Sequence, residues 1–517
     1  MRHSAFSYLR PVLLLVVMFF TLSLTANSQD FEEWKENYLQ EFKDFQNKYD
    51  KQFHKMLQQE WTNLDVNISP DPYKENKPER PPTVEEPSVS DSKPVPNVSL
   101  TNKEKSSPPV TKKTTDTDEI TVENRKKAPP ANLQSGLKPT FKPTVEKADV
   151  TTKNLMFFDV PIRYRYYTAF QKQIDKPVNK KVISNFWKHL STKDYPPFLN
   201  QIKQVQNKLS LNDFGYAQLL ENIGEQIYGK DTPESTLFAW FMLTQSGFNT
   251  RIGYNQENVY LLIQTTPRLF NTTYFTMKGT KYYAISFNET NNKAPSKLYT
   301  YKGDYPKSDM KALNLSATDF PAFPEKPMNK TMSFSYKDTS YSFDVPINQQ
   351  VINYYKNYPN AYLGLYFNSR MDTTTYNQLA RSLRPLLKGK SDFEKVSILL
   401  RFVQTSLEYK TDQQQFNKEK YMFPEEALYY PAADCEDRAA LFAYLVEHLV
   451  GLDYISLRYP NHLTVAVHFP ENPPEGTHFN YRGKSYYMAD PTYINAGIGM
   501  VMPSIKNKSP EIMDWEM

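Results

Sequence analysis

Aromatic and apolar residues recur every eleven positions near the start of the chain. Phe31, Phe42, Phe53 and Leu64 are spaced in this way, and most residues on the opposite face are Lys, Glu, Asp or Gln. An eleven-residue repeat gives about 3.67 residues per turn, so these side chains stay on one face of a helix. The pattern predicts a long amphipathic helix over residues 30–66.

The apolar stripe of this helix has two possible partners. It can pack on the protein's own body or on a second copy of the chain. Alternatively, residues 31–64 can dock on an envelope surface or on an envelope partner. The sequence leaves both interpretations open.

The segment before this helix has the pattern of a secretory signal peptide. An apolar run over residues 11–24 follows Arg2 and Arg10 and precedes small residues, which predicts a signal peptide at residues 1–28. A retained anchor helix is the alternative. No later segment reaches the roughly 18 apolar residues that a membrane span needs. We therefore expect the mature protein to be exported across the inner membrane, to have no membrane span, and to be periplasmic or associated with the cell envelope.

Residues 67–152 have the composition of a linker. Fourteen prolines lie between Pro70 and Pro143, and the only aromatic residues there are Tyr73 and Phe141. Such a segment buries too little apolar surface to offset the entropy lost on ordering. We expect it to be a disordered linker.

The remainder of the chain contains an internal duplication. Four blocks recur in the same order: 155–162 with 340–347, 211–230 with 390–410, 234–264 with 438–468, and 274–286 with 478–490. The last two pairs are 204 residues apart, whereas the earlier pairs are 185 and 179 apart, so the second copy carries about 25 extra residues just before Cys435. The preserved order favours two tandem copies of one fold over chance similarity. We place them at residues 153–335 and 336–517.

Each copy predicts a helix followed by antiparallel strands. Ala439, Phe442 and Leu445 have helical spacing, and Gly451 can end that helix. The segments after it are short, rich in β-branched and aromatic residues, and bounded by Pro, Asn and Gly, as strands are. The expected fold class is α+β, with a helix packed on an antiparallel sheet.

The only cysteine of the chain lies where this helix is predicted to begin. Cys435 follows Asp434, a good N-cap residue, and the N–H groups and dipole at a helix N-terminus favour a thiolate. His462 begins one predicted strand, and Asp490 ends another. The three residues together predict a nucleophile, a base and a carboxylate that orients the base.

The motifs "DCEDRAALFAYL", "YPNHLTVAV" and "YYMADPTY" resemble the transglutaminase-like superfamily, which has a papain-type Cys-His-Asp architecture. The resemblance covers residues 340–510 and is to the version found in exported proteins of Bacteroidota. It implies tandem transglutaminase-like (papain-like) domains. It also implies that Cys435 is the nucleophile, His462 the base and Asp490 the orienting carboxylate.

This chain departs from the family in its approach to the cysteine. Many members have a Trp-x-x-Cys-type approach, which is absent here, so the side chain that would donate to the oxyanion is open. The backbone N–H of Cys435 is the stronger candidate donor. Gln404 and Tyr430 are weaker candidates.

The sequence leaves several alternatives to the triad open. Cys435 can be an inert buried thiol, and His468 and His478 are rival bases. Asp437 and Arg438 lie one turn into the helix, where we expect a structural ion pair. One cysteine and no close pair of histidines cannot supply the three or four ligands of a Cys/His metal site, so we expect neither a metal nor a cofactor.

The first copy lacks the predicted catalytic residues. At the constant separation of 204 residues, Asp231, Asn258 and Ser286 stand where Cys435, His462 and Asp490 stand in the second copy. We expect the first copy to be catalytically inactive and to pack against the second copy or bind its substrate.

These residues favour thiol acyl transfer at amide bonds of peptides or proteins. The acyl-enzyme is resolved by water in a peptidase or amidase and by an amine in a transglutaminase, and we favour hydrolysis. The net charge of +5 is mild and the basic residues are spread out, which argues against nucleic acid as a partner. The alternative is a non-enzymatic envelope scaffold or peptide-binding protein with a residual triad.

Overall fold

The structure, a computed structural model, describes residues 48–71, 80, 82–84, 98–99, 150–255, 257–285, 287, 297–513 and 515. The predicted signal peptide, the first part of the predicted amphipathic helix, Ser286 and most of the predicted linker lie outside these residues. In the part of the chain that is described, no helix is both long enough and apolar enough to cross a membrane.

The first half of the body, residues 150–314, consists of a hairpin, a group of helices and a sheet. The hairpin strands are β4 (Val150–Phe157) and β5 (Val160–Tyr167). The helices are η1 (Thr168–Phe170), α2 (Lys180–Ser191), α3 (Pro196–Lys208), α4 (Asp213–Tyr228) and α5 (Pro233–Gln245). The sheet strands are β6 (Thr250–Tyr254), β7 (Val259–Ile263), β9 (Thr273–Met277), β10 (Thr280–Ala284) and β11 (Lys297–Tyr301). A short parallel pair is formed by β8 (Thr265–Thr266) and β12 (Leu313–Asn314).

The second half, residues 327–513, is built from the same kinds of element. Its hairpin strands are β13 (Pro327–Tyr336) and β14 (Thr339–Asn348), and β3 (Val98–Ser99) pairs with β14. Its helices are α6 (Gln349–Tyr355), α7 (Gly364–Phe367), α8 (Thr373–Leu387), α9 (Asp392–Ser406), α10 (Asp412–Phe416), α11 (Pro424–Tyr429), α12 (Cys435–Leu445) and the π-helical turn η3 (Val446–Val450). Its sheet strands are β15 (Tyr454–Tyr459), β16 (His462–His468), β17 (His478–Tyr481), β18 (Lys484–Ala489) and β19 (Glu511–Met513).

The two halves repeat one topology. The order β11-β6-β7-β10-β9 within the first sheet is matched by β19-β15-β16-β18-β17 in the second, and all these strands are antiparallel to their neighbours. The strands β5 and β14 start 179 residues apart, as do the helices α4 and α9, whereas β6 and β15 start 204 residues apart. The 25 extra residues fall between α9 and α12, where the second half has α10 and α11. The α+β class is confirmed.

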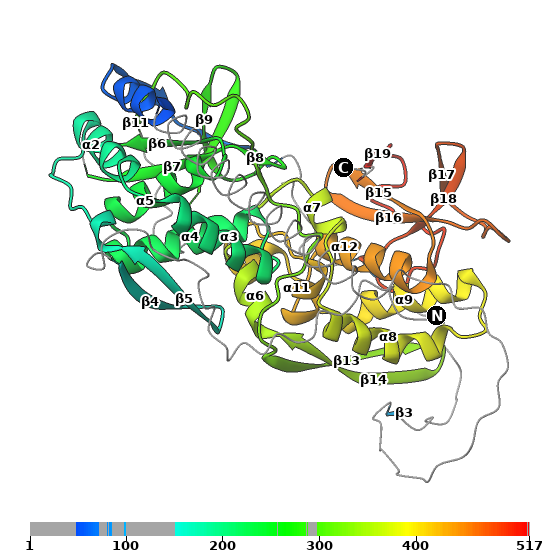
Figure 1. The fold of residues 1–517 in the computed structure, drawn as a ribbon. Helices are drawn as coiled ribbons and strands as arrows, with labels where there is room; N and C mark the ends of the chain where they lie inside the picture. Colours follow the sequence, from blue (N-terminus) through cyan, green and yellow to red (C-terminus); the bar gives the residue numbers. More distant parts are fainter. Residues whose placement is uncertain are drawn as a thin grey trace, which may run out of the picture.

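Each half is arranged in three layers, with the helices between the sheet and the hairpin (Figure 1). In the second half α12 packs on β16, while α8 and α9 pack on the hairpin β13–β14. Every residue of α12 is buried, as expected for a helix enclosed on all sides. Side-chain caps set where the outer helices begin: Ser391 accepts a hydrogen bond from the backbone of Glu394 at the start of α9.

The predicted helix over residues 30–66 is too long at its C-terminal end. The chain is helical over 48–57, and residues 61–65 form strand β1 (Trp61–Asp65). This strand pairs along its whole length with β11 at one edge of the first sheet, and its sequence, WTNLD, contains Asn and Asp, which are weak helix formers. Leu64 kept the eleven-residue spacing although its backbone is extended, so the spacing alone did not identify the end of the helix.

The predicted linker is not wholly outside the fold. Strand β2 (Asn67–Ile68) pairs with β9 at the other edge of the first sheet. Farther along, the backbone of Val84 donates to the carbonyl of Ile494, and the backbone of Ile494 donates to Pro82. Composition predicts only that a segment cannot form a core of its own; short extended pieces can still add their backbone to an existing edge. The described pieces of this segment therefore correct the prediction of a linker disordered throughout.

The structure also corrects the predicted start of the second copy and one of the four matched blocks. The predicted boundary between residues 335 and 336 falls inside the hairpin β13–β14, so the second half begins at Pro327. The block at 155–162 spans the turn of its hairpin, with Phe158 and Asp159 at positive φ, but the block at 340–347 lies within a single strand. The two hairpins are therefore equivalent when their turns are aligned, and the shared sequence "FDVPI" does not mark equivalent positions.

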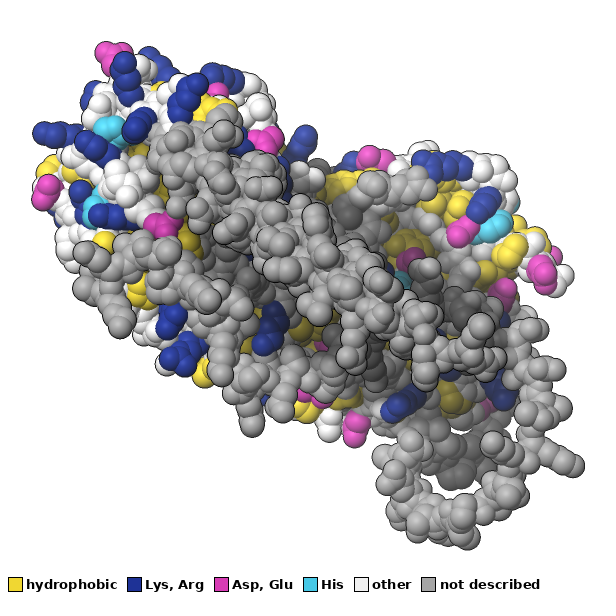
Figure 2. Space-filling model, in the orientation of Figure 1, with side chains coloured by type: hydrophobic (Ala, Val, Ile, Leu, Met, Phe, Trp, Pro, Cys, Tyr) yellow, Lys and Arg dark blue, Asp and Glu magenta, His cyan; other side chains and the backbone are white. Residues whose placement is uncertain are grey.

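The C-terminal part of the apolar stripe, which the structure describes, packs on the protein's own body. Phe53 and Leu57 are fully buried, and the ring of Phe53 lies 4.6 Å from that of Trp187 on α2. For these residues the first of the two predicted partners is confirmed. Basic side chains on the face drawn in Figure 2 are dispersed, with acidic side chains among them.

The same helix also places a carboxylate inside the first half. Asp50 is 3% exposed and accepts hydrogen bonds from Gln245 Nε2 at 2.6 Å, Tyr305 at 3.1 Å and Tyr195 at 3.3 Å. Burial raises the pKa of Asp50 to about 6, although these three hydrogen bonds oppose the rise. Docking of the helix is therefore coupled to uptake of a proton by Asp50 between pH 3.8 and about pH 6.

Replacing Asp50 by Asn should remove a pH-dependent part of the stability. Because the folded-state pKa of Asp50 is raised above 3.8, its contribution is fully present below about pH 3.8 and is lost as the pH rises through about 6. We expect the free energy of unfolding of wild type, relative to Asp50→Asn, to fall by about 2 kcal/mol between pH 4 and pH 7. Urea unfolding at both pH values measures this. The exposed Asp65→Asn is the control, and a difference that does not change with pH would contradict the expectation.

Candidate active site

Cys435 is the first residue of α12, as the sequence predicts. Asp434 before it is extended (φ −95°, ψ −159°), and its backbone N–H donates to Asp437 Oδ2 at 3.4 Å. The thiol therefore belongs to the first turn of α12, next to the positive end of the helix dipole. Cys435 is 2% exposed.

The thiol forms a hydrogen bond to a partner that the sequence analysis did not predict. Cys435 Sγ donates to Glu436 Oε2 at 2.9 Å, and Glu436 is itself 4% exposed. The sequence showed an acid next to the cysteine, but neighbouring residues on a helix do not normally face each other. Sequence reasoning therefore assigned no role to Glu436.

His462 and Asp490 form a buried pair. Val465 on β16 lies opposite Ala489 on β18, so the start of β16 and the end of β18 meet at one edge of the sheet. His462 Nε2 lies 2.8 Å from Asp490 Oδ2, and both side chains are almost fully buried. Because a carboxylate only accepts, Nε2 carries the proton in this pair. The predicted base and its orienting carboxylate are thus brought together.

The second ring nitrogen of His462, Nδ1, is available to act as a base. His462 Nδ1 is buried and has no hydrogen-bond partner among the described residues. In a neutral imidazole protonated at Nε2, Nδ1 holds a free lone pair. The Asp490 carboxylate is held in turn by the backbone N–H groups of Thr492 at 2.9 Å and Tyr493 at 3.3 Å. The ring orientation is therefore fixed from the side opposite to Nδ1.

A buried arginine connects the helix of Cys435 to the segment after Asp490. Arg438 donates to the backbone carbonyls of Ala433 at 3.0 Å, Gln404 at 3.1 Å, Leu407 at 2.7 Å and Pro491 at 3.4 Å. These carbonyls come from the loop before α12, from the end of α9 and from the segment after β18. The expected ion pair with Asp437 is replaced by these bonds to the backbone.

Gln404 has a structural role and is not available as an oxyanion donor. Its Nε2 donates to the carbonyls of Asp490 at 3.0 Å, Tyr493 at 2.8 Å and Ala496 at 3.0 Å. An amide nitrogen has only two protons, so these three carbonyls already share them. Gln404 therefore fixes the loop that carries the orienting carboxylate.

The two rival histidines lie away from the His462–Asp490 pair. His468 is at the far end of β16, where its Nδ1 contacts the carbonyl of Ser485 at 3.0 Å, and His478 is exposed on β17. The ring of Tyr430 packs against Phe416 at 4.9 Å.

Several carboxylates lie close together at the first turn of α12. Ligand oxygens of Asp412, Asp434 and Glu436 lie within 4.8 Å of one another, and all three residues are buried. Burial and the neighbouring acids hold the pKa of Asp437 well above its ordinary value. The three oxygens are the ligand type that Ca²⁺ and Mg²⁺ prefer, so these residues could hold such a cation. This cluster was not predicted from the sequence, because Asp412 lies in the inserted segment, far from Asp434 and Glu436 along the chain.

The corresponding positions of the first half are built differently. Helix α5 begins at Pro233, after the N-cap Thr232, which leaves Asp231 outside the helix with φ 55°. The backbone of Asn258 donates to Asn255 Oδ1 in the turn between β6 and β7. Ser286, the third predicted counterpart, lies outside the described residues.

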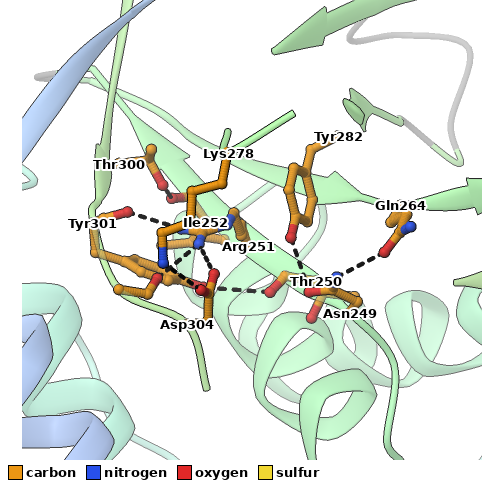
Figure 3. A network of polar contacts seen from close by, with 11 residues as sticks. Asn249, Thr250, Arg251, Ile252, Gln264, Lys278, Tyr282, Thr300, Tyr301 and Asp304 are labelled. Atoms are coloured by element: carbon orange, nitrogen blue, oxygen red, sulfur yellow. Dashed lines mark hydrogen bonds and ion pairs between the residues drawn. The ribbon is translucent and has the colours of Figure 1, made fainter. Parts of the chain in front are cut away.

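The first half has its own buried polar network, drawn in Figure 3. Arg251 on β6 donates to the carbonyls of Tyr301 at 2.8 Å and Gly303 at 2.7 Å and forms an ion pair with Asp304. Its guanidinium carbon lies 4.7 Å from the ring centroid of Tyr301. This network joins β6 to the segment after β11 and contains no cysteine.

Comparisons with known proteins add no evidence on the role of this site, so its interpretation rests on the residues described above. No protein-family model, no curated protein and no solved structure matches the chain.

Replacing Gln404 by Glu should destabilise the second half. The change removes the donor shared by three carbonyls and places carboxylate oxygens opposite them, so we expect a loss of about 2–4 kcal/mol in the free energy of unfolding. Guanidinium unfolding followed by circular dichroism measures it. Gln413→Glu makes the same chemical change at an exposed site and serves as the control. Equal midpoints for the two variants would show that the Gln404 bonds contribute nothing.

Proposed function

We propose that this protein is an exported thiol acyl-transfer enzyme that acts on amide bonds of peptides or proteins. The observation that carries the proposal is the buried His462–Asp490 pair, whose second ring nitrogen is buried and unpartnered. Arg438 supports the proposal because it bonds the carbonyls of Ala433, just before α12, and of Pro491, just after Asp490, and so ties these two segments together. A base with a free lone pair beside a helix-terminal cysteine has the parts that nucleophilic catalysis needs.

The proposed reaction uses these groups in order. The thiol proton of Cys435 passes to His462 Nδ1, and Sγ forms a bond to the substrate carbonyl carbon. Negative charge on the carbonyl oxygen is stabilised by N–H groups at the start of α12, with that of Cys435 as the principal donor. The C–N bond then breaks, the leaving amine takes the proton from His462, and the acyl group stays on sulfur. Water or a second amine, deprotonated by His462, releases the acyl group and restores the thiol.

Asp490 supports this cycle without exchanging a proton. Its Oδ2 accepts from His462 Nε2, which keeps the ring in the tautomer with Nδ1 free and stabilises the imidazolium that forms. Its Oδ1 accepts from the backbone of Thr492 and Tyr493. A carboxylate held from both sides cannot rotate away from the ring.

The architecture supports the transglutaminase-like assignment as part of this proposal. A cysteine at a helix start with its histidine and aspartate on neighbouring antiparallel strands is the arrangement that the resemblance implies. The repeated topology fits tandem domains of which only the second carries the triad. On this proposal, the first half packs against the second: Tyr354 of α6 donates to Asn212 at the start of α4, at 2.8 Å.

The products and the setting follow from the same proposal. Water as the acceptor gives a peptidase or amidase, which we favour, and an amine gives a cross-link. The predicted signal peptide places the enzyme in the periplasm or at the cell envelope. Its substrate is then a peptide or protein of that compartment.

One observation favours a second candidate function. The thiol is buried and bonded to Glu436, as it would be in a scaffold or peptide-binding protein with a residual triad. Such a protein would turn over no substrate, whatever its affinity for peptides. Turnover therefore separates the two functions.

Removing the base should abolish most of the activity. We expect His462→Ala to lower kcat/KM by about 10²–10⁴-fold, the usual contribution of a general base, and Cys435→Ser to remove turnover. Release of fluorescent peptides, with and without an added amine, measures hydrolysis and transfer together. His468→Ala, at the other end of β16, is the matched control and should keep wild-type activity. Turnover that survives Cys435→Ser would refute the proposal.

A further inference from the structure

We propose that the loop from Asp490 to Ala496 is a binding edge for an extended peptide that carries a small apolar residue two positions after a proline. In the resting protein this edge is occupied by residues 82–84 of the chain itself, Pro-Thr-Val, which an outside peptide must displace. The inference rests on the proposed function in one respect, because it identifies the edge as the place where the substrate peptide is held. Binding itself does not depend on a reactive thiol.

The pairing between the two segments is of the kind found between parallel strands. The backbone N–H of Val84 donates to the carbonyl of Ile494 at 2.9 Å, and the backbone N–H of Ile494 donates to the carbonyl of Pro82 at 3.0 Å. Thr83 lies opposite Ile494 in a parallel bridge. Pairing of this kind gives affinity for the backbone of a peptide, and pockets for individual side chains give specificity. A proline fits at the first position because the bond to Ile494 uses its carbonyl.

Asn495 adds a side-chain contact to the backbone of the bound segment. Its Nδ2 donates to the carbonyl of Val84 at 3.2 Å, and its Oδ1 accepts from Arg401 on α9. Because an amide oxygen only accepts, the bond from Arg401 fixes which end of the amide faces the peptide. Asn495 has a left-handed backbone, with φ 65°, which asparagine adopts more readily than most residues. Its side chain is thus placed and oriented to hold a peptide carbonyl.

The edge is held in position by the same amide that supports the orienting carboxylate. Gln404 Nε2 donates to the carbonyl of Asp490 at 3.0 Å. It also donates to the carbonyls of Tyr493 at 2.8 Å and Ala496 at 3.0 Å, which lie on either side of Ile494. An edge that is already ordered loses little conformational entropy on binding. An extended peptide therefore meets a preformed partner.

The side chains of the bound segment show what the edge selects. Val84 is half-buried and packs against an apolar cluster on the second sheet that includes Leu457, Tyr459 and Met488. A charged side chain at this position would enter that cluster without a partner, which is costly. Thr83 is exposed, so the middle position is less restricted. The edge therefore reads the third residue of the segment most strictly.

The edge adjoins the proposed catalytic pair. It begins at Asp490, whose Oδ1 accepts from the backbone N–H groups of Thr492 and Tyr493. Tyr459 of the apolar cluster lies opposite His462 in the pairing of β15 with β16. A peptide at the edge is therefore held by the loop that carries the orienting carboxylate, close to where an enzyme that acts on amide bonds must hold its substrate.

The resident segment makes a contact that is small enough to be exchanged. The contact consists of three hydrogen bonds and one apolar side chain, within a segment whose composition predicts no core of its own. A flexible tether raises the effective concentration of such a segment to the order of mM. A peptide supplied in trans therefore competes with residues 82–84, and a change that expels them leaves the edge open.

Binding of a fluorescently labelled peptide, ERPPTVEEP, to the full chain tests the edge by anisotropy; its sequence is that of residues 79–87. Val84→Asp expels the resident segment, because it places a carboxylate in the apolar cluster. We expect Val84→Asp to bind the peptide at least about tenfold more tightly than wild type, in which the tethered segment competes. Methylation of the valine nitrogen in the peptide removes the N–H that bonds Ile494 and should weaken binding about tenfold. The reversed sequence has the same composition and should not bind.

A change on the protein side is made in the Val84→Asp chain. Asn495→Asp keeps an acceptor for Arg401 but places an oxygen opposite the peptide carbonyl, so we expect affinity to fall at least about tenfold. Asn472→Asp is the matched control, because Asn472 also has a left-handed backbone, with φ 51°, and is exposed; it should leave affinity unchanged.

Three results overturn the edge: no binding to Val84→Asp, equal binding to wild type and Val84→Asp, or equal binding of the methylated and unmethylated peptides. The last comparison changes only the peptide, so it decides the question even if Asn495→Asp does not fold.

Turnover separates failure of the edge from failure of the proposed function. For a fluorescent substrate that contains Pro-Thr-Val, we expect Val84→Asp to lower KM by about the same factor as it tightens binding. A KM equal to that of wild type would show that the edge does not hold the substrate. If the peptide binds as expected but no variant turns over substrate, the edge stands and the proposed function falls. If substrate is turned over but Val84→Asp binds no peptide, the proposed function stands and the edge falls.

Discussion

A buried arginine joins the parts of the candidate site. A guanidinium removed from water must find partners for its N–H groups or destabilise the fold, and Arg438 finds them in backbone carbonyls from three separate segments. Gln404 does the same for the loop that begins at Asp490. Because backbone carbonyls are bonded, neither the start of α12 nor this loop can shift without leaving polar groups unsatisfied. The relative position of the nucleophile helix and the orienting carboxylate depends on these bonds.

Within that fixed frame, two sets of charges act on one sulfur atom in opposite directions. The positive end of the α12 dipole favours loss of the thiol proton, whereas the carboxyl group of Glu436, which the thiol contacts at 2.9 Å, favours keeping it.

The two halves share one topology but have acquired different additions. The first sheet is extended at both edges by strands from the N-terminal segment, β1 beside β11 and β2 beside β9. These additions pair the backbone groups of edge strands that would otherwise be open to other chains. The second half has instead the insertion with α10 and α11, and this insertion brings Asp412 to the carboxylates of Asp434 and Glu436. The additions have therefore tied the N-terminal segment to the first half and enclosed the candidate site in the second.

The sequence by itself determined which residues stand at the ends of which elements. Cys435 at a helix start and His462 at a strand start follow from capping and alternation, which are properties of short stretches. The repeat separation of 204 residues predicted that the two halves share one fold, but it did not predict the order of their strands. Tertiary structure decided the rest. The helix gives way to β1 because Trp61 pairs with Tyr301, far along the chain, and no local pattern records that pairing. The Glu436 contact with sulfur depends on side-chain rotamers, and the approach of Asp412 depends on the path of an insertion. Both are settled only when the core closes around α12.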